Sequence, residues 1–170
     1  MKIGVIYSSK TGNTKKVADA ISAELPADTA IHHVSEKPNP DQFDFIFMGY
    51  WVDKGTADQE AINYMQTVSG KKVAQFVTLG AYPDSDHARQ SLAKGAACFG
   101  EDCEVIDNYI CQGAIDPKLI EWMKQLGPDH PHAPDEARIK RWKDASTRPN
   151  QDDLKKAGEF ARGIYKSLTN

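Results

Sequence analysis

Residues 2–14, Lys2-Ile-Gly-Val-Ile-Tyr-Ser-Ser-Lys-Thr-Gly-Asn-Thr14, set the pattern that the rest of the chain follows. The stretch begins as a short apolar run, typical of a buried strand, and passes into a loop of hydroxyl side chains. An amphipathic helix follows, with Val17, Ile21 and Leu25 on its inner face. The start of such a helix has unpaired N–H groups and the positive end of the helix dipole, so it can hold a phosphate group. We therefore expect a strand, a phosphate-binding loop and a helix in succession.

The composition of the loop suits a phosphate ligand. Its hydroxyls are hydrogen-bond donors, its glycine lets the backbone approach closely, and its asparagine tolerates an unusual backbone conformation. A helix cap alone would explain one Ser or Thr, but not the whole run. The spacing differs from both G-x-x-x-x-G-K-[ST] and G-x-G-x-x-G, which excludes the usual triphosphate and dinucleotide loops. The expected phosphate-loop residues are Ser9, Lys10, Thr11, Gly12, Asn13 and Thr14.

The motif Ser9-x-Thr11-Gly12-Asn13-Thr14, preceded by Val5-Ile6-Tyr7, resembles the phosphate-binding loop of the flavodoxins, which bind FMN. The resemblance implies FMN as the cofactor. It also implies an α/β fold with a flavodoxin-like, doubly wound, five-stranded parallel sheet of order 2-1-3-4-5. It covers about the first 113 residues. The remainder resembles a subgroup of flavodoxin-like proteins of anaerobic bacteria, some of which are associated with reductases.

Length and composition indicate one ordinary globular domain over residues 1–170. The net charge of −3 argues against nucleic-acid binding. Neither a membrane span nor a signal segment is evident, so we expect a cytoplasmic protein that does not enter the membrane. Cys98, Cys103 and Cys111 form no C-x-x-C motif and are expected to be buried or half-buried thiols.

Strands and helices are expected to alternate, which predicts a parallel sheet with helices on both faces. After the first strand, the expected strands are 29–34, 43–48, 71–79 and 102–111. Beyond Gly113 the alternation stops, and residues 116–150 should form a helical extension before the last helix. Its first helix, 117–126, is expected to bury Leu119, Ile120 and Met123, and a charged helix should span 135–145.

In a sheet of this order, ligands bind at the carboxyl ends of the strands, between strands 1 and 3. The loops after the third and fourth strands contain aromatic residues that could enclose a planar ring. The expected ring-binding residues are Tyr50, Trp51, Val52, Gly55, Leu79, Gly80, Ala81 and Tyr82. The resemblance further suggests that a peptide at Gly55 flips to accept a hydrogen bond from flavin N5–H. Which aromatic residue stacks on which face of the ring is left open.

Charged residues suggest the electrostatic environment of the expected ring and a candidate docking surface for a partner protein. Four acidic residues on the two expected ring loops, Asp53, Asp58, Asp84 and Asp86, should disfavour added negative charge on the ring, with Lys10 and Lys54 opposing them. Residues 135–148 are the most basic stretch. We expect a solvated helix face there, with a docking patch anchored by Trp142 as the alternative.

The favoured function is a low-potential one-electron carrier that receives electrons from a reductase and passes them to an acceptor enzyme. The alternative is an FMN-dependent NAD(P)H reductase of quinones or other small oxidants. The expected partners are redox proteins, and the chain should be a monomer or weak homodimer. We expect no catalytic side chain and no metal; His130 and His132 should lie in a solvated turn. A phosphorelay receiver is disfavoured because the first strand ends in Tyr7-Ser8-Ser9 rather than an acidic pair.

Overall fold

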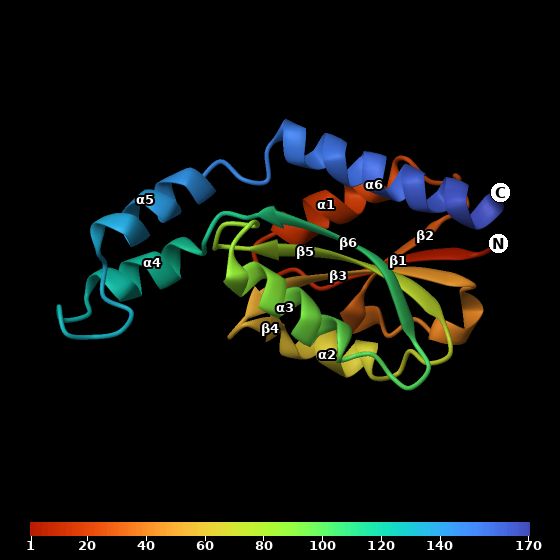
Figure 1. Ribbon diagram of the computed structural model, residues 1–170, viewed down its shortest axis with the longest axis horizontal. Helices are drawn as coiled ribbons and strands as arrows, with labels where there is room; N and C mark the ends of the chain where they lie inside the picture. Colours follow the sequence, from red (N-terminus) through yellow and green to blue (C-terminus); the bar gives the residue numbers. More distant parts are fainter.

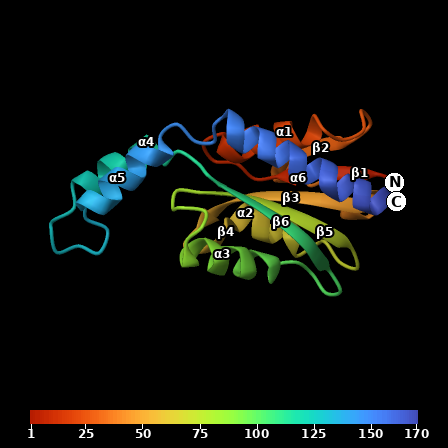
Figure 2. The same cartoon turned by 45° about the horizontal axis from the view of Figure 1, so that its top comes forward.

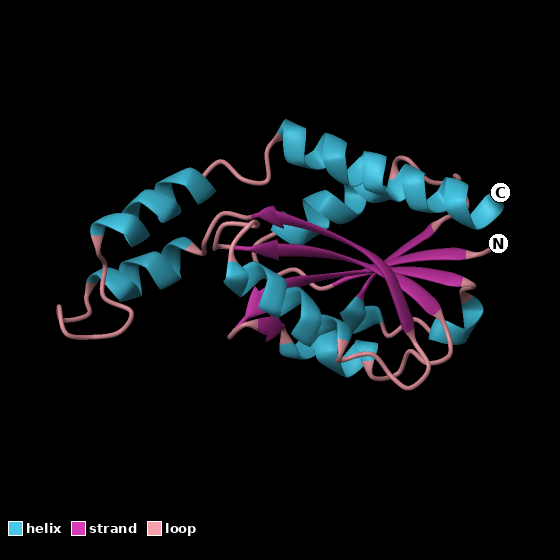
Figure 3. Ribbon diagram, in the orientation of Figure 1, coloured by secondary structure: helices cyan, strands magenta, loops and turns pink.

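The computed structural model describes residues 1–170 and has a central parallel sheet with the strand order β2-β1-β3-β5-β6 (Figures 1 and 3). The short strand β4 pairs with β3 outside this path. This is the doubly wound order 2-1-3-4-5 predicted from the sequence. The elements are β1 (Ile3–Tyr7), α1 (Asn13–Ser22), β2 (Ala30–His33), β3 (Phe45–Asp53), β4 (Thr56–Ala57), α2 (Gln59–Met65), β5 (Lys72–Leu79), α3 (Asp86–Ala96), β6 (Glu104–Gln112), α4 (Pro117–Lys124), α5 (Glu136–Ala145) and α6 (Gln151–Thr169).

The sheet is covered on both faces because its central strands are apolar on both sides. One face packs against α1 and α6, and the hydrophobic cluster on this face includes the buried side chains of Val17, Ile21 and Ala161. The opposite face packs against α2 and α3 and includes Met48 and Met65. Figure 2 shows α1 and α6 on one side of the sheet and α3 on the other. The carboxyl ends of the parallel strands are thereby left open for a site.

Strand β3 is longer than the sequence indicated. We predicted a strand over 43–48, but β3 continues to Asp53. Its last residues pair with β4 in a tight hairpin, and the turn residues Lys54 and Gly55 have φ values of 49° and 80°. Two successive positive φ values are what a two-residue hairpin turn with the right twist requires. The hairpin therefore supplies a regular extension where a loop was expected.

The helices α4 and α5 project beyond the carboxyl ends of the strands and lie side by side (Figures 1 and 2). Both were predicted, but the expectation that Leu119 is buried was wrong, since its exposed fraction is 44%. Met123 is buried as expected. None of the helices in the molecule combines the length and the apolar composition needed for a membrane span.

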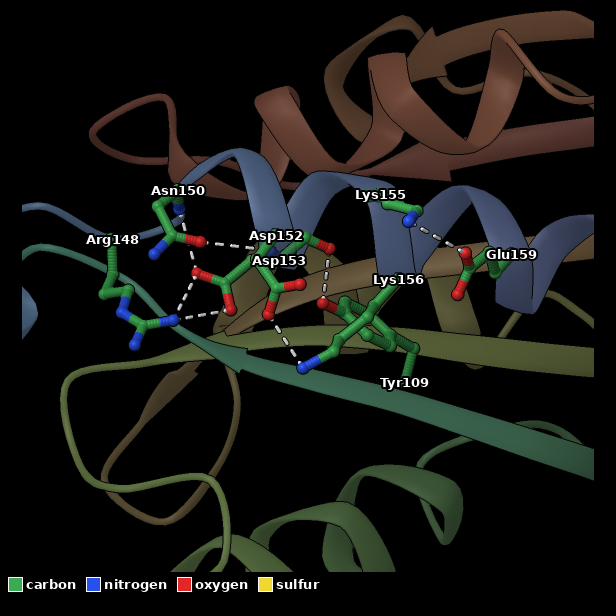
Figure 4. Close-up of polar contacts among 8 residues, drawn as sticks. All are labelled: Tyr109, Arg148, Asn150, Asp152, Asp153, Lys155, Lys156 and Glu159. Carbon is green, nitrogen blue, oxygen red and sulfur yellow. Dashed lines mark hydrogen bonds and ion pairs between the residues drawn. The ribbon is translucent and has the colours of Figure 1, made fainter.

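The two ends of this helical extension are fastened together. At its start, the N–H of Ala114 donates to the carbonyl of Arg148 at 2.9 Å. At its end, Arg148 Nη1 contacts both carboxylate oxygens of Asp153 at 2.8 and 3.0 Å, as Figure 4 shows. Asp153 also shares a reciprocal cap with Asn150, and its carbonyl accepts from the Tyr109 hydroxyl at 2.6 Å. The network ties the extension to both β6 and α6.

Replacing Asp153 with alanine should lower the free energy of unfolding by about 2 kcal/mol, because a partly buried ion pair and a helix cap are lost together. It should also speed proteolytic cleavage within 115–147. The matched control is Asp152→Ala on the same turn, which removes only the exposed ion pair with Lys156. That control should change stability by less than about 0.5 kcal/mol. Urea denaturation and limited trypsin digestion measure both effects; equal losses in the two variants would contradict the anchoring role.

Candidate functional site

A cavity of about 540 Å³ lies at the carboxyl ends of the strands. Its walls come from the loop after β1, the end of β3, the loop after β5, the segment after β6, and the helical extension. The volume is in the range of small-molecule and cofactor sites. The cavity is therefore at the place that the strand order predicts for a ligand.

The loop between β1 and α1 forms one end of the cavity. Helix α1 begins after Gly12, which has a φ of 93° and makes no side-chain cap. The hydroxyl of Ser9 instead accepts from the N–H of Gly12 at 3.1 Å and from that of Lys15 at 3.4 Å. The N–H groups of Asn13 and Thr14 have no partner within the helix, because the first turn never does. This end of the cavity has donors suited to an anion.

Contacts beneath the loop hold it in place. The hydroxyls of Thr14 and Thr78 share a buried hydrogen bond of 2.9 Å. The Asn13 amide donates to the carbonyl of Ala114 at 2.8 Å, which links the loop to the start of the extension. The buried Ser8 hydroxyl donates to Asp58 at 2.7 Å, and burial raises the pKa of that carboxyl. The loop is thus positioned by contacts with β5, with the segment after β6 and with the residue that caps α2.

Two aromatic side chains from different elements line the cavity. Trp51 is on the final part of β3, and Lys10 Nζ lies 5.5 Å from the centre of its ring. Tyr82 follows β5, and its hydroxyl donates to Asp144 of α5 at 2.8 Å. This hydrogen bond to the carboxylate is the main reason that the pKa of Tyr82 is raised. The two rings are therefore held by different elements: Trp51 by β3, and Tyr82 by the loop after β5 and its hydrogen bond to α5.

Most of the residues expected at the site line the cavity. These are Ser9, Lys10, Thr11, Asn13, Thr14, Trp51, Val52, Leu79, Gly80, Ala81 and Tyr82. Gly12, Tyr50 and Gly55 do not. Gly12 supplies the left-handed backbone that turns the loop into the helix.

Tyr50 is placed in the core instead of the cavity. It is fully buried, and its hydroxyl donates to Gln75 at 3.1 Å. Because side chains alternate along a strand, Tyr50 and Trp51 point to opposite faces once β3 extends through both. Gly55 lies at the hairpin turn, where a side chain would come within 3.6 Å of His87. Gly55 does not line the cavity, and the flip of its peptide stays a prediction.

The charge of the cavity differs from our expectation. None of the four acidic residues expected near the ring lines it. The one carboxylate in the lining is Asp116, which lies 3.8 Å from Lys10. Lys10, Arg138 and Arg141 supply positive charge. The site is cationic, so the prediction of an acidic environment was wrong.

Part of the wall comes from the helical extension, which sequence analysis did not assign to the site. This wall consists of Leu119, Met123, His132, Arg138, Arg141 and Trp142. Trp142 is only 6% exposed, so it packs inward and is not an exposed docking anchor. The basic cluster was visible in the sequence, but nothing local showed that it faces the cavity.

Comparisons with known proteins agree with this geometry. The model of the flavodoxin domain matches residues 4–162. A flavodoxin-like domain-containing protein of Clostridioides difficile, BilS, is 31% identical over 171 residues, with 96% of each chain covered. Among solved structures, flavodoxin 2 from Bacillus cereus is similar with a TM-score of 0.57 at 19% identity, covering 98% of this chain and 99% of that one. A flavoprotein from Lactobacillus acidophilus in complex with FMN has a TM-score of 0.50 at 16% identity, covering 71% and 97% of the two chains.

Proposed function

This chain belongs to the flavodoxin domain family, and from that premise we propose that it binds FMN in the cavity and works as a redox flavoprotein. The observation that carries the proposal is the uncapped start of α1, which opens into the cavity between hydroxyls of Ser9 and Thr11. Such a combination of free N–H groups and hydroxyls suits a phosphate monoester. The chemistry of the donors therefore fits the phosphate end of FMN.

The remaining lining suits a planar aromatic group. Trp51 and Tyr82 supply aromatic faces, and the small residues Gly80 and Ala81 also line the cavity. When bound, FMN supplies the redox chemistry, accepting and releasing one or two electrons. The protein's own residues hold the phosphate, enclose the ring and keep water away from it. Lys10, Arg138 and Arg141 favour added negative charge in the cavity, which raises the reduction potential relative to an acidic site.

The function that we favour is that of an electron carrier, which receives electrons from a reductase and passes them to an acceptor enzyme. Stepwise anaerobic reduction of the FMN-loaded protein, followed by visible absorption, tests this function. Reduction in two separate one-electron steps is the expected result for a carrier. A single two-electron step would contradict it, and a colourless protein that takes up no FMN would contradict the proposal as a whole.

A second candidate is an FMN-dependent NAD(P)H reductase of quinones or other small oxidants. The specific observation in its favour is that α4 and α5 add apolar and basic side chains to the cavity wall, in addition to the loops that are expected to hold the cofactor. Stopped-flow mixing of the FMN-loaded protein with NADPH distinguishes the two functions. Rapid bleaching at micromolar NADPH supports the reductase, whereas reduction only through an added flavoprotein reductase supports the carrier.

A pair of neighbouring substitutions tests the assignment of the aromatic wall. Trp51→Leu should weaken FMN binding by about tenfold, because stacking on an aromatic face is worth about 0.5–1.5 kcal/mol beyond area burial. Tyr50→Phe should leave FMN affinity unchanged, since Tyr50 lies in the core. Quenching of FMN fluorescence on titration with apoprotein measures both. A larger loss with Tyr50→Phe would restore Tyr50 to the site.

A further inference from the structure

Helix α5 turns two arginines toward the cavity. Arg138 and Arg141 are three residues apart on the helix, so they share one face. Arg138 is held from behind, because its guanidinium donates to the carbonyls of Ala133 at 2.7 Å and Pro131 at 3.3 Å. These contacts fix the side chain without neutralising its charge.

Arg141 has no partner of its own. The other arginines pair with Asp86, Asp153 or Glu24, or donate to backbone carbonyls in the case of Arg138. Arg141 makes no hydrogen bond or ion pair in the structure, although it is half-buried and lines the cavity. It lies near Tyr82, because its positive charge opposes the rise in the pKa of Tyr82 that the hydrogen bond to Asp144 causes. A half-buried guanidinium without a carboxylate partner has its forked donors free for an anionic ligand.

The extension also supplies apolar side chains to the cavity lining. Leu119 and Met123 are four residues apart on α4 and so share one face, and Ile115 and Trp142 line the cavity as well. Leu119 lines the cavity and keeps 44% of its surface exposed, so apolar surface is available there to a ligand. An apolar surface with a pair of arginines at its margin suits a ligand with an apolar body and a carboxylate.

We propose that the space between the helical extension and the Tyr82 loop is a binding site for a small aromatic or otherwise planar carboxylate, which Arg141 holds through its guanidinium. The proposal rests on the proposed function, because the bound FMN would form the inner side of this site. A single carboxylate is favoured over a dinucleotide phosphate because Arg141 is the only arginine of this wall without a hydrogen bond, and one guanidinium matches one carboxylate.

Isothermal titration of the FMN-loaded protein with 2-naphthoate tests the site, and neutral 2-naphthamide is the matched ligand. Flavin content is measured first by absorbance. Wild-type protein should bind 2-naphthoate at least about tenfold more tightly than 2-naphthamide. Arg141→Gln should weaken naphthoate binding by about tenfold to 100-fold, the range for a charged hydrogen-bonding pair, and leave naphthamide binding little changed. Arg141→Lys should give an intermediate loss, because lysine keeps the charge but not the fork.

The control for net charge is Lys143→Gln on the same helix, since Lys143 is exposed and does not line the cavity. It should bind naphthoate as wild type does. Equal affinity for both ligands, or an equal loss in Lys143→Gln and Arg141→Gln, would overturn the carboxylate site. The carboxylate site would also be overturned if Arg141 contributed to the binding of NADPH but not of naphthoate. The same holds if Arg141→Gln lowered only the affinity for FMN. Failure to take up FMN would contradict the proposed function, whereas FMN uptake without naphthoate binding would contradict this site alone.

Discussion

Thr11→Asp is expected to raise the dissociation constant for FMN by at least about 100-fold. Thr11 lies at the exposed end of the phosphate loop and lines the cavity. The substitution removes a hydroxyl donor and places a carboxylate beside a ligand phosphate. Two like charges about 4 Å apart repel by roughly 4 kcal/mol at the dielectric constant typical of a protein surface, and the lost hydrogen bond adds to this. A loss of about 2.7 kcal/mol is enough for the 100-fold change.

Thr11→Asn is the matched control for this effect, because its side chain is similar in size and carries no charge. It should weaken FMN binding by less than about tenfold. Fluorescence quenching gives both dissociation constants, and circular dichroism shows that the exposed position leaves the fold intact. If Thr11→Asp bound FMN as tightly as Thr11→Asn does, the phosphate would lie elsewhere in the cavity. The assignment of residues 9–14 would then be wrong.

Gly49→Ala is expected to lower the free energy of unfolding by about 3 kcal/mol. Gly49 is in the middle of the sheet, directly opposite Phe76 on β5. A Cβ atom at Gly49 would lie 2.1 Å from Cε2 and 2.2 Å from Cζ of the Phe76 ring, which no relaxation of a buried ring easily relieves. The ring covers the glycine, so the two residues form one packing unit.

The double variant Gly49→Ala with Phe76→Leu separates overpacking from other causes. Leucine lacks the ring atoms that clash, so the double variant should be more stable than the sum of the single effects by at least about 0.5 kcal/mol. The control is Gly163→Ala in α6, where an added Cβ meets nothing within 4 Å. That change should raise stability by about 0.5–1 kcal/mol, because alanine is the better helix former. Additive losses in the double variant would contradict the packing explanation.

Local patterns predicted most of the fold. The apolar runs of β1, β3 and β5 and the helical spacing of Val17 and Ile21 indicated the alternation, and the comparison with flavodoxins agrees with it. The loop from Ser9 to Thr14 was recognisable because its hydroxyls, glycine and asparagine follow one another in the sequence. The half-buried or buried cysteines were likewise predicted from their number and spacing.

The site as a whole depended on contacts between distant residues. Neighbouring side chains point to opposite faces only where the chain is a regular strand, and a shift of one residue along a strand reverses the face. Because the hairpin at Lys54 and Gly55 extends β3 through Tyr50 and Trp51, the two side chains alternate in this way. No pattern within Tyr50-Trp51 contains that information.

What the sequence alone determined, therefore, is the order of strands and helices, and it marked residues 9–14 as a candidate phosphate loop, because both signals arise from periodicity and neighbouring side chains. Only the tertiary structure decided the sign of the charge in the cavity. Asp58 is buried, where it accepts a hydrogen bond from Ser8. Arg141 lines the cavity together with Lys10, although the two residues are 131 positions apart in the chain. The physical reason is that burial and charge compensation depend on the packing of α4 and α5 against the strand ends, which residues far apart in the chain establish together.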